Sequence, residues 1–122
     1  MNILLYIAAG SAIGGVCRFL LSKLITEHTS SAFPWGTFVV NILGCLLIGV
    51  LYGLFDRGCN ISESTRLFLT VGFCGGFTTF STFAHENFLL FSSGHMLTVA
   101  AYAALSFFVG VVMAWLGHSL VR

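Results

Sequence analysis

Four long apolar stretches constrain this chain more than any other feature of its sequence. They cover about residues 3–25, 35–55, 65–91 and 96–120, and each is close to the roughly 20 residues that a helix needs to cross a bilayer. Only 7% of the 122 residues are charged, whereas a soluble domain carries about 25% charged residues. We therefore expect an all-α membrane protein, a single unit over residues 1–122 with four transmembrane helices.

The third stretch contains a segment that argues against one continuous helix. Gly75 and Gly76 are adjacent, and Thr78 and Thr79 follow shortly after them. Glycine weakens a helix, and threonine hydroxyls compete for its backbone hydrogen bonds. We expect the third helix to be broken near its middle, unwinding between Gly75 and Thr78 and restarting near Thr79. In lipid an unwound backbone is tolerated where it lines a site, and its carbonyls can hold a small cation. A continuous helix with closely packed glycines is the alternative.

Two phenylalanines follow the expected break. Phe80 and Phe83 are three residues apart and therefore share one face of the restarted helix, whereas Ser81 and Thr82 face elsewhere. A phenyl ring has a positive edge, so ring edges along a narrow path favour an anion that has lost its water. Ordinary packing is the alternative, because the chain holds 13 phenylalanines.

Polar side chains inside the apolar stretches need partners. Asn41 shares a helix face with Thr37 and Gly44, and it bonds either to another helix or to a permeating species. Arg18 lies inside the first stretch, so its charge either faces a protein interior or extends to the membrane surface.

Three more polar residues fall on faces that point to a pathway. Glu86 continues the face of Phe83, either as a pathway residue or as part of a solvated helix end. Tyr102 and Ser106 are four residues apart on the fourth stretch. Their hydroxyls donate either to a passing anion or to carbonyls of their own helix.

Small residues recur at spacings that indicate close helix packing. Gly10 and Gly14 have this spacing on the first stretch, and Gly49 and Gly53 repeat it on the second. The cysteines lack C-x-x-C spacing and are expected to be small buried residues without a disulfide or zinc site. They are Cys17, Cys45, Cys59 and Cys74.

The basic residues give only a weak signal for orientation. Four crossings place both termini on one side with Arg57, Arg66 and Arg122, and the other side carries Lys23. Because orientation follows the Lys/Arg bias, so small a difference predicts insertion both ways up and head-to-head pairing. Four short helices cannot enclose a broken helix, so we expect an oligomer. The net charge of +1 gives no case for nucleic acid.

Three motifs resemble the Fluc (CrcB) family of fluoride channels, also called fluoride exporters. They are GGVCRF at residues 14–19, GTFVVNILG at residues 36–44 and, above all, GGFTTFSTF at residues 75–83, and the likeness covers essentially the whole chain. The resemblance implies an antiparallel dual-topology homodimer in the lipid of a bacterial inner membrane. It implies two fluoride pores, a structural sodium ion at the dimer centre, and passive export of fluoride from the cytoplasm that relieves its toxicity.

The resemblance also implies roles for individual residues. The backbone carbonyls of Gly75 and Thr78 from both subunits would hold the sodium ion. Arg18 would lie at an aqueous vestibule and Glu86 near the pore. The implied fluoride pathway comprises Asn41, Phe80, Ser81, Thr82, Phe83, Tyr102 and Ser106. The next step of the hydroxyl row on the fourth helix falls on Gly110, which has no hydroxyl.

Two other classes of protein fit the four spans less well. A proton-coupled exporter of the small multidrug type needs a carboxylate in its first span, and residues 1–24 contain no Asp or Glu. A scaffold subunit that transports nothing leaves the broken helix and Asn41 unexplained. No Walker loop or catalytic constellation is present in the sequence, so we do not expect an enzyme.

Overall fold

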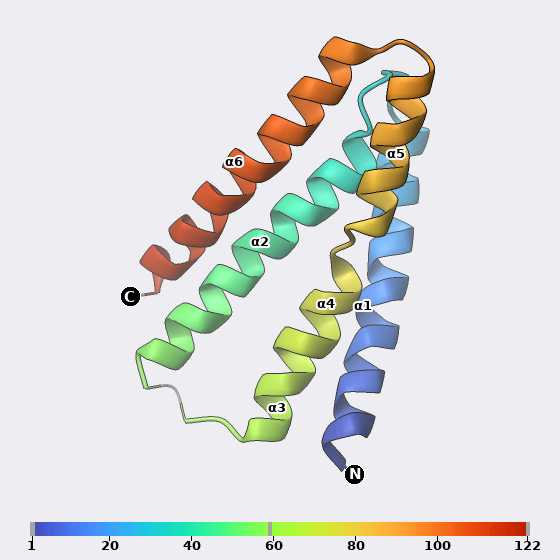
Figure 1. Ribbon diagram of the computed structural model, residues 1–122. Helices are drawn as coiled ribbons and strands as arrows, with labels where there is room; N and C mark the ends of the chain where they lie inside the picture. Colours follow the sequence, from blue (N-terminus) through green and yellow to red (C-terminus); the bar gives the residue numbers. More distant parts are fainter. Residues whose placement is uncertain (1, 59, 122) are drawn as a thin grey trace.

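Helices are the only regular elements in the residues that the computed structural model describes, 2–58 and 60–121 (Figure 1). Four segments are long and apolar enough to cross a membrane, namely Ile3–Glu27, Trp35–Asp56, Glu63–Ser92 and Met96–Leu120. Three of them are the single helices α1 (Asn2–Glu27), α2 (Trp35–Asp56) and α6 (Met96–Leu120). The predicted all-α chain with four membrane-spanning helices is confirmed.

The third span is assembled from several pieces. They are α3 (Glu63–Leu67), the π-helix η1 (Phe68–Cys74), α4 (Gly75–Phe77) and α5 (Ser81–Ser92). In η1 the backbone widens, and the N–H of Gly75 reaches back to the carbonyl of Thr70. The Thr70 hydroxyl donates in turn to the carbonyl of Arg66 at 2.8 Å. The sequence pattern did not predict this π-helix.

Residues 78–80 interrupt the third span. Thr78 is extended, with φ −97° and ψ 158°, and the helix resumes at Ser81. The predicted break near the middle of the span is confirmed, but its position differs from the expected one. Gly75 remains helical, with φ −62° and ψ −38°, and the restart comes at Ser81 and not near Thr79. The glycines permit the break, and the contact that fixes its position comes from α2.

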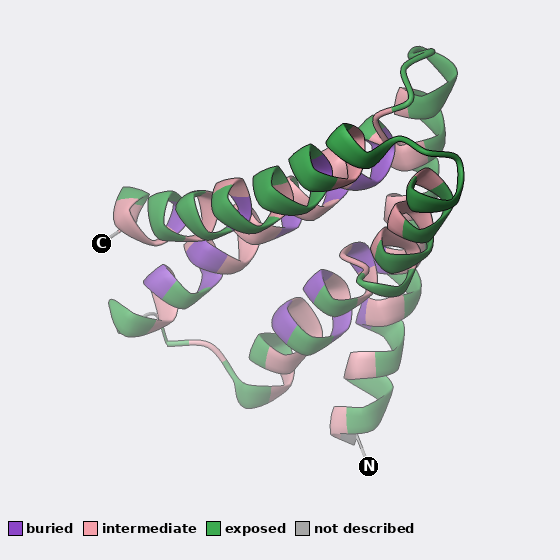
Figure 2. Ribbon diagram, turned by 45° about the horizontal axis from the view of Figure 1, so that its top comes forward, coloured by how far each residue is buried: buried purple, intermediate pink, exposed green. Residues whose placement is uncertain are grey.

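The helices form two arms that diverge toward the end of the molecule where both termini lie (Figures 1 and 2). The first arm consists of α1 packed on α3, η1 and α4, and the second arm consists of α2 packed on α6. The arms meet toward the opposite end, where Gly36 of α2 lies against Ser22 and Thr26 of α1.

Glycines form the seam of each arm. A Cβ atom at Gly10 would lie 2.5 Å from the carbonyl oxygen of Phe68, and one at Gly14 would collide with that of Phe73. In the second arm a Cβ atom at Gly49 would collide with the carbonyl oxygen of Ala114. The close packing predicted from the glycine spacing is therefore confirmed in both arms.

We expect Gly14→Ala to lower the melting temperature of the detergent-solubilised protein. The added methyl group meets backbone atoms of η1, which cannot move aside as a side chain can, and overpacking of this kind costs about 1–3 kcal/mol. Gly15→Ala is the matched control, because a Cβ atom there has nothing within 4 Å. Thermal unfolding followed by size-exclusion chromatography measures both. Equal melting temperatures of the two variants would contradict the close packing of α1 against η1 at Gly14.

Large apolar side chains cover most of the outer surface. Leu97 is 87% exposed, whereas Val40 and Tyr102 are among the few large side chains that are buried (Figure 2). Such a surface suits contact with lipid, so the chain is a multi-pass membrane protein. Cys17, Cys45 and Cys74 are free, and Cys59 lies outside the described residues.

Candidate functional site

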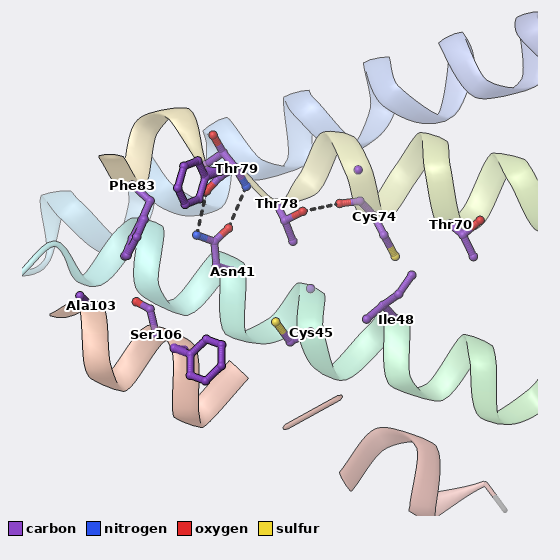
Figure 3. Close-up of a pocket in the computed structure, with 14 residues that line it drawn as sticks. Asn41, Cys45, Ile48, Thr70, Cys74, Thr78, Thr79, Phe83, Ala103 and Ser106 are labelled. Carbon is purple, nitrogen blue, oxygen red and sulfur yellow. Dashed lines mark hydrogen bonds between the residues drawn. The ribbon is translucent and has the colours of Figure 1, made fainter. Parts of the chain in front are cut away.

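A cleft of about 750 Å³ opens between the two arms at the level of the break (Figure 3). Its walls come from α2, from both sides of the break in the third span, and from α6. The residues that the sequence predicted for a site and that line this cleft are Asn41, Gly75, Thr78, Phe80, Phe83 and Ser106. Arg18, Ser81, Thr82, Glu86 and Tyr102 lie outside its lining.

Asn41 of α2 holds the break in place. Its Nδ2 donates to the carbonyl oxygen of Thr79 at 3.0 Å, and its Oδ1 accepts the backbone N–H of Thr79 at 2.9 Å (Figure 3). One side chain therefore satisfies both polar groups of an unwound residue. Gly44, one turn along α2, permits the close approach, because a Cβ atom there would collide with the side chain of Thr78. Of the two partners considered for Asn41, the structure selects another span of the protein.

Other polar groups at the break are also satisfied within the chain. Arg18 of α1 donates from Nε to the carbonyl oxygen of Gly76 at 3.1 Å. The Thr79 hydroxyl accepts the N–H of Thr82 at 3.3 Å and caps the first turn of α5. The Thr78 hydroxyl donates to the carbonyl of Cys74 at 2.9 Å. The first two contacts replace bonds that a continuous helix would supply, and the Thr78 hydroxyl adds to the helical bond between the Thr78 N–H and the Cys74 carbonyl.

Two carbonyl oxygens remain open beside the cleft. In a continuous helix the N–H of Thr79 would bond to Gly75 and that of Thr82 to Thr78. Those donors instead bond to Asn41 and to the Thr79 hydroxyl. In the part of the chain that the structure describes, no other donor forms a hydrogen bond with either carbonyl. Gly75 and Thr78 both line the cleft, so it carries two unpaired backbone acceptors.

Phe80 and Phe83 lie next to each other at the start of α5. Their ring centroids are 5.8 Å apart with planes tilted by 43°, and both residues line the cleft. Phe80 is 77% exposed, whereas Phe83 packs against the ring of Tyr102 at 4.8 Å. The spacing argument placed the two rings on one face correctly. Most of the Phe80 side chain is left uncovered by the residues that the structure describes.

Glu86 accepts hydrogen bonds from hydroxyl groups of two other helices. Tyr102 donates to its Oε1 at 2.7 Å, and Thr37 donates to its Oε2 at 2.9 Å. Tyr102 is fully buried, and its hydroxyl donates to Glu86 of α5 and not to a carbonyl of its own helix. Sequence reasoning missed this group because its members come from α2, α5 and α6. Hydrogen bonds from hydroxyls to a carboxylate are strong, so this group ties α2, α5 and α6 together beside the cleft.

Comparison with known proteins identifies the family. The family described as CrcB-like protein, Camphor Resistance (CrcB), matches residues 5–118. The chain belongs to the CrcB family. A relative from Flavobacterium psychrophilum is 41% identical over 122 residues, which cover 100% of this chain and 98% of the relative. A relative from Phocaeicola vulgatus is 47% identical over 117 residues, which cover 96% of this chain and 96% of the relative. A relative from Chloroflexus aurantiacus is 43% identical over 122 residues, which cover 100% of this chain and 97% of the relative.

All three relatives of this CrcB chain are named "Fluoride-specific ion channel FluC". These names describe ion channels and not enzymes. Because the alignments run over nearly the whole length of each protein, the likeness includes all four membrane-spanning segments and the residues at the break in the third.

Among the hydroxyl and amide side chains that line the CrcB cleft, Ser106 alone has no hydrogen-bond partner in the described residues. Its Oγ is buried and forms no hydrogen bond there. A buried hydroxyl without a partner normally costs free energy, so such a group in a cleft is available to a ligand. One turn further along α6, Gly110 is buried against Cys45 of α2.

A second, smaller hollow of about 320 Å³ lies on the other side of the break. Arg18, Lys23, Ser22, Thr26 and Thr82 line it, together with Phe19 and Glu27. Arg18 therefore reaches the break through its bond to Gly76 and also lines this hollow. The predicted Ser81 is exposed, and its hydroxyl lies 3.4 Å from that of Thr79.

Proposed function

We propose that this CrcB chain forms a fluoride-selective channel of the bacterial inner membrane, through which fluoride leaves the cytoplasm passively. The observation that carries the proposal is the cleft at the break, whose wall presents the rings of Phe80 and Phe83. Fluoride gives up water only where positive ring edges and hydrogen-bond donors replace it. The relatives, 41–47% identical over nearly the full length and named as fluoride-specific ion channels, support the choice of anion.

The other predicted site residues have supporting roles around these rings. Asn41 keeps the unwound segment open and presents its amide to the cleft, and Ser106 supplies a free hydroxyl. Arg18 gives the second hollow a positive charge that attracts anions from solution. Glu86 orients Tyr102 behind Phe83. Ser81 and Thr82 begin α5 between the two cavities.

The channel is completed by a second copy of the chain in the opposite orientation. Phe80 is 77% exposed and Gly75 is exposed beside the cleft, so a single chain leaves its own pathway open on one side. A second copy closes that side, and two copies give two pores. The weak Lys/Arg bias permits both orientations in one membrane. The partners we propose are thus a second copy, fluoride and the surrounding lipid.

We expect the loop between α2 and α3 to be found on both faces of the membrane. A variant with Asn60→Cys as its only cysteine is treated in whole cells with a membrane-impermeant maleimide, before and after permeabilisation. About half of the protein should react before permeabilisation, because the weak charge bias favours neither orientation. Reaction of nearly all or nearly none of the protein in intact cells would contradict the antiparallel pair.

We propose that the open carbonyls of Gly75 and Thr78 hold a structural sodium ion between the two copies. The residues fit such an ion, because backbone oxygens without donors suit a small hard cation and two copies supply four of them. A bound cation would satisfy carbonyls that lipid cannot, and its charge favours anions in the pores beside it.

Exchange of sodium for N-methylglucamine on both sides of the membrane is expected to reduce fluoride flux by about tenfold or more, since unpaired carbonyls destabilise the site. Restored sodium should restore the flux without carrying current itself. Flux is measured with a fluoride electrode, and flame photometry verifies the exchange. Undiminished flux after verified removal of sodium and similar cations would exclude a required ion.

Growth of a bacterium that lacks its own fluoride exporter tests the proposed physiology. Expression of this chain should allow growth at fluoride concentrations that arrest the parent strain. The strain should gain no tolerance to cationic dyes, which a small multidrug-type exporter would remove. Unchanged fluoride sensitivity with verified membrane insertion would contradict the proposed export.

A further inference from the structure

The row of hydroxyl side chains on α6 ends at Gly110, and the thiol of Cys45 on α2 lies beside this glycine. Tyr102, Ser106 and Gly110 occupy successive turns of α6, and Gly110 has no side chain to continue the row. A Cβ atom at position 110 would lie 3.2 Å from the Sγ atom of Cys45. Gly110 is buried, so the space that a side chain would take on α6 is taken by the sulfur atom from α2.

Cys45 lines the cleft together with Ser106 (Figure 3). It follows Asn41 by one helical turn, and both residues line the cleft. Ser106 provides an independent sign that this part of the cleft receives a ligand, because its Oγ is buried and has no partner among the described residues. In those residues the Cys45 thiol likewise forms no disulfide.

We infer that the Cys45 thiol is a pathway donor that replaces the missing hydroxyl at position 110. A thiol is a weaker donor than a hydroxyl, but it adds a group that can donate to an anion where Gly110 offers only a hydrogen atom on carbon. The donor thus reaches the anion from α2, and the small residue on α6 makes room for it. The inference rests on the proposed fluoride pathway and adds Cys45 to it.

Substitutions at positions 45 and 110 separate this role from packing. Cys45→Ala is expected to lower fluoride flux in liposomes by about tenfold, which corresponds to about 1.4 kcal/mol on the barrier. Cys45→Ser keeps a donor and is expected to retain most of the flux. The double variant Cys45→Ala, Gly110→Ser moves the hydroxyl to the opposite helix and should recover flux. The double variant Cys45→Ala, Gly110→Ala fills the same space without a hydroxyl and should remain slow.

Each outcome of this series supports or overturns the inference. Wild-type flux in Cys45→Ala, or equal recovery with alanine and serine at position 110, would overturn it and assign Cys45 to packing. Size-exclusion chromatography checks folding, and Cys45→Val replaces Cys45→Ala if the latter does not fold. Cys17→Ala, on α1 and away from the cleft, is the control. Absence of fluoride flux in the wild-type protein would instead overturn the proposed function.

Discussion

Fluoride flux is expected to fall by about a hundredfold when Phe80 or Phe83 is replaced by isoleucine, equivalent to about 2.7 kcal/mol on the barrier. Isoleucine retains apolar bulk but has no ring edge to face the anion. The two positions should differ in stability. Phe80 is 77% exposed, so its replacement should leave folding of the chain nearly unchanged. Phe83 loses its ring contact with Tyr102, which is worth about 0.5–1.5 kcal/mol.

Phe88→Ile is the matched control for these variants. Phe88 also belongs to α5 and is 63% exposed, but it does not line the cleft. Its replacement should leave fluoride flux within about twofold of the wild-type value, because it changes no group beside the pathway. Flux per amount of reconstituted protein is measured with a fluoride electrode. Unchanged flux in both Phe80→Ile and Phe83→Ile would make these rings ordinary packing residues.

Replacement of Asn41 should abolish flux and also destabilise the chain. Asn41→Ala leaves the N–H and the carbonyl of the half-buried Thr79 without their partner, and an unpaired group costs up to about 1–3 kcal/mol when it is fully buried. Asn41→Asp still accepts the N–H of Thr79, but it cannot donate to the carbonyl and places a negative charge beside the anion. The aspartate variant should therefore be the more stable of the two and equally inactive.

Asn87→Ala provides the control for loss of an amide. Within residues 2–58 and 60–121, the Asn87 amide donates only to the carbonyl of Phe83 on its own helix, at 3.0 Å, and does not hold the break. Thermal unfolding and fluoride flux are measured on all three variants. An Asn41→Ala protein with normal flux would mean that the pathway does not require the unwound segment to be held by α2.

The sequence predicted those features that depend on local pattern. The lengths of the apolar stretches predicted the four membrane-spanning segments. The spacing of the glycines predicted where the helices pack closely within each arm. Adjacent glycines and threonines indicated the break, and the three-residue spacing placed Phe80 beside Phe83. Each of these inferences needs only the periodicity of a helix and the free energy of burying polar groups in lipid.

Features that depend on distant partners were not predictable in the same way. The break begins at Thr78 because Asn41, 38 residues away from Thr79, supplies the bonds that the helix loses. The spacing of Tyr102 showed its face but not that Glu86 would be its acceptor. Arg18 could be placed in a span, but its contact with the carbonyl of Gly76 depends on how α1 packs against α4. Periodicity tells which face a residue occupies and not which residue it meets.

Fluoride efflux from liposomes tests the central claim most directly. Vesicles that contain the purified protein and potassium fluoride are diluted into fluoride-free buffer, and valinomycin is added to allow potassium to leave. We predict immediate fluoride release at equal pH on both sides, and retention of chloride in matched vesicles loaded with potassium chloride. Retention of fluoride after valinomycin, or release only when a pH gradient is imposed, would contradict a passive fluoride channel.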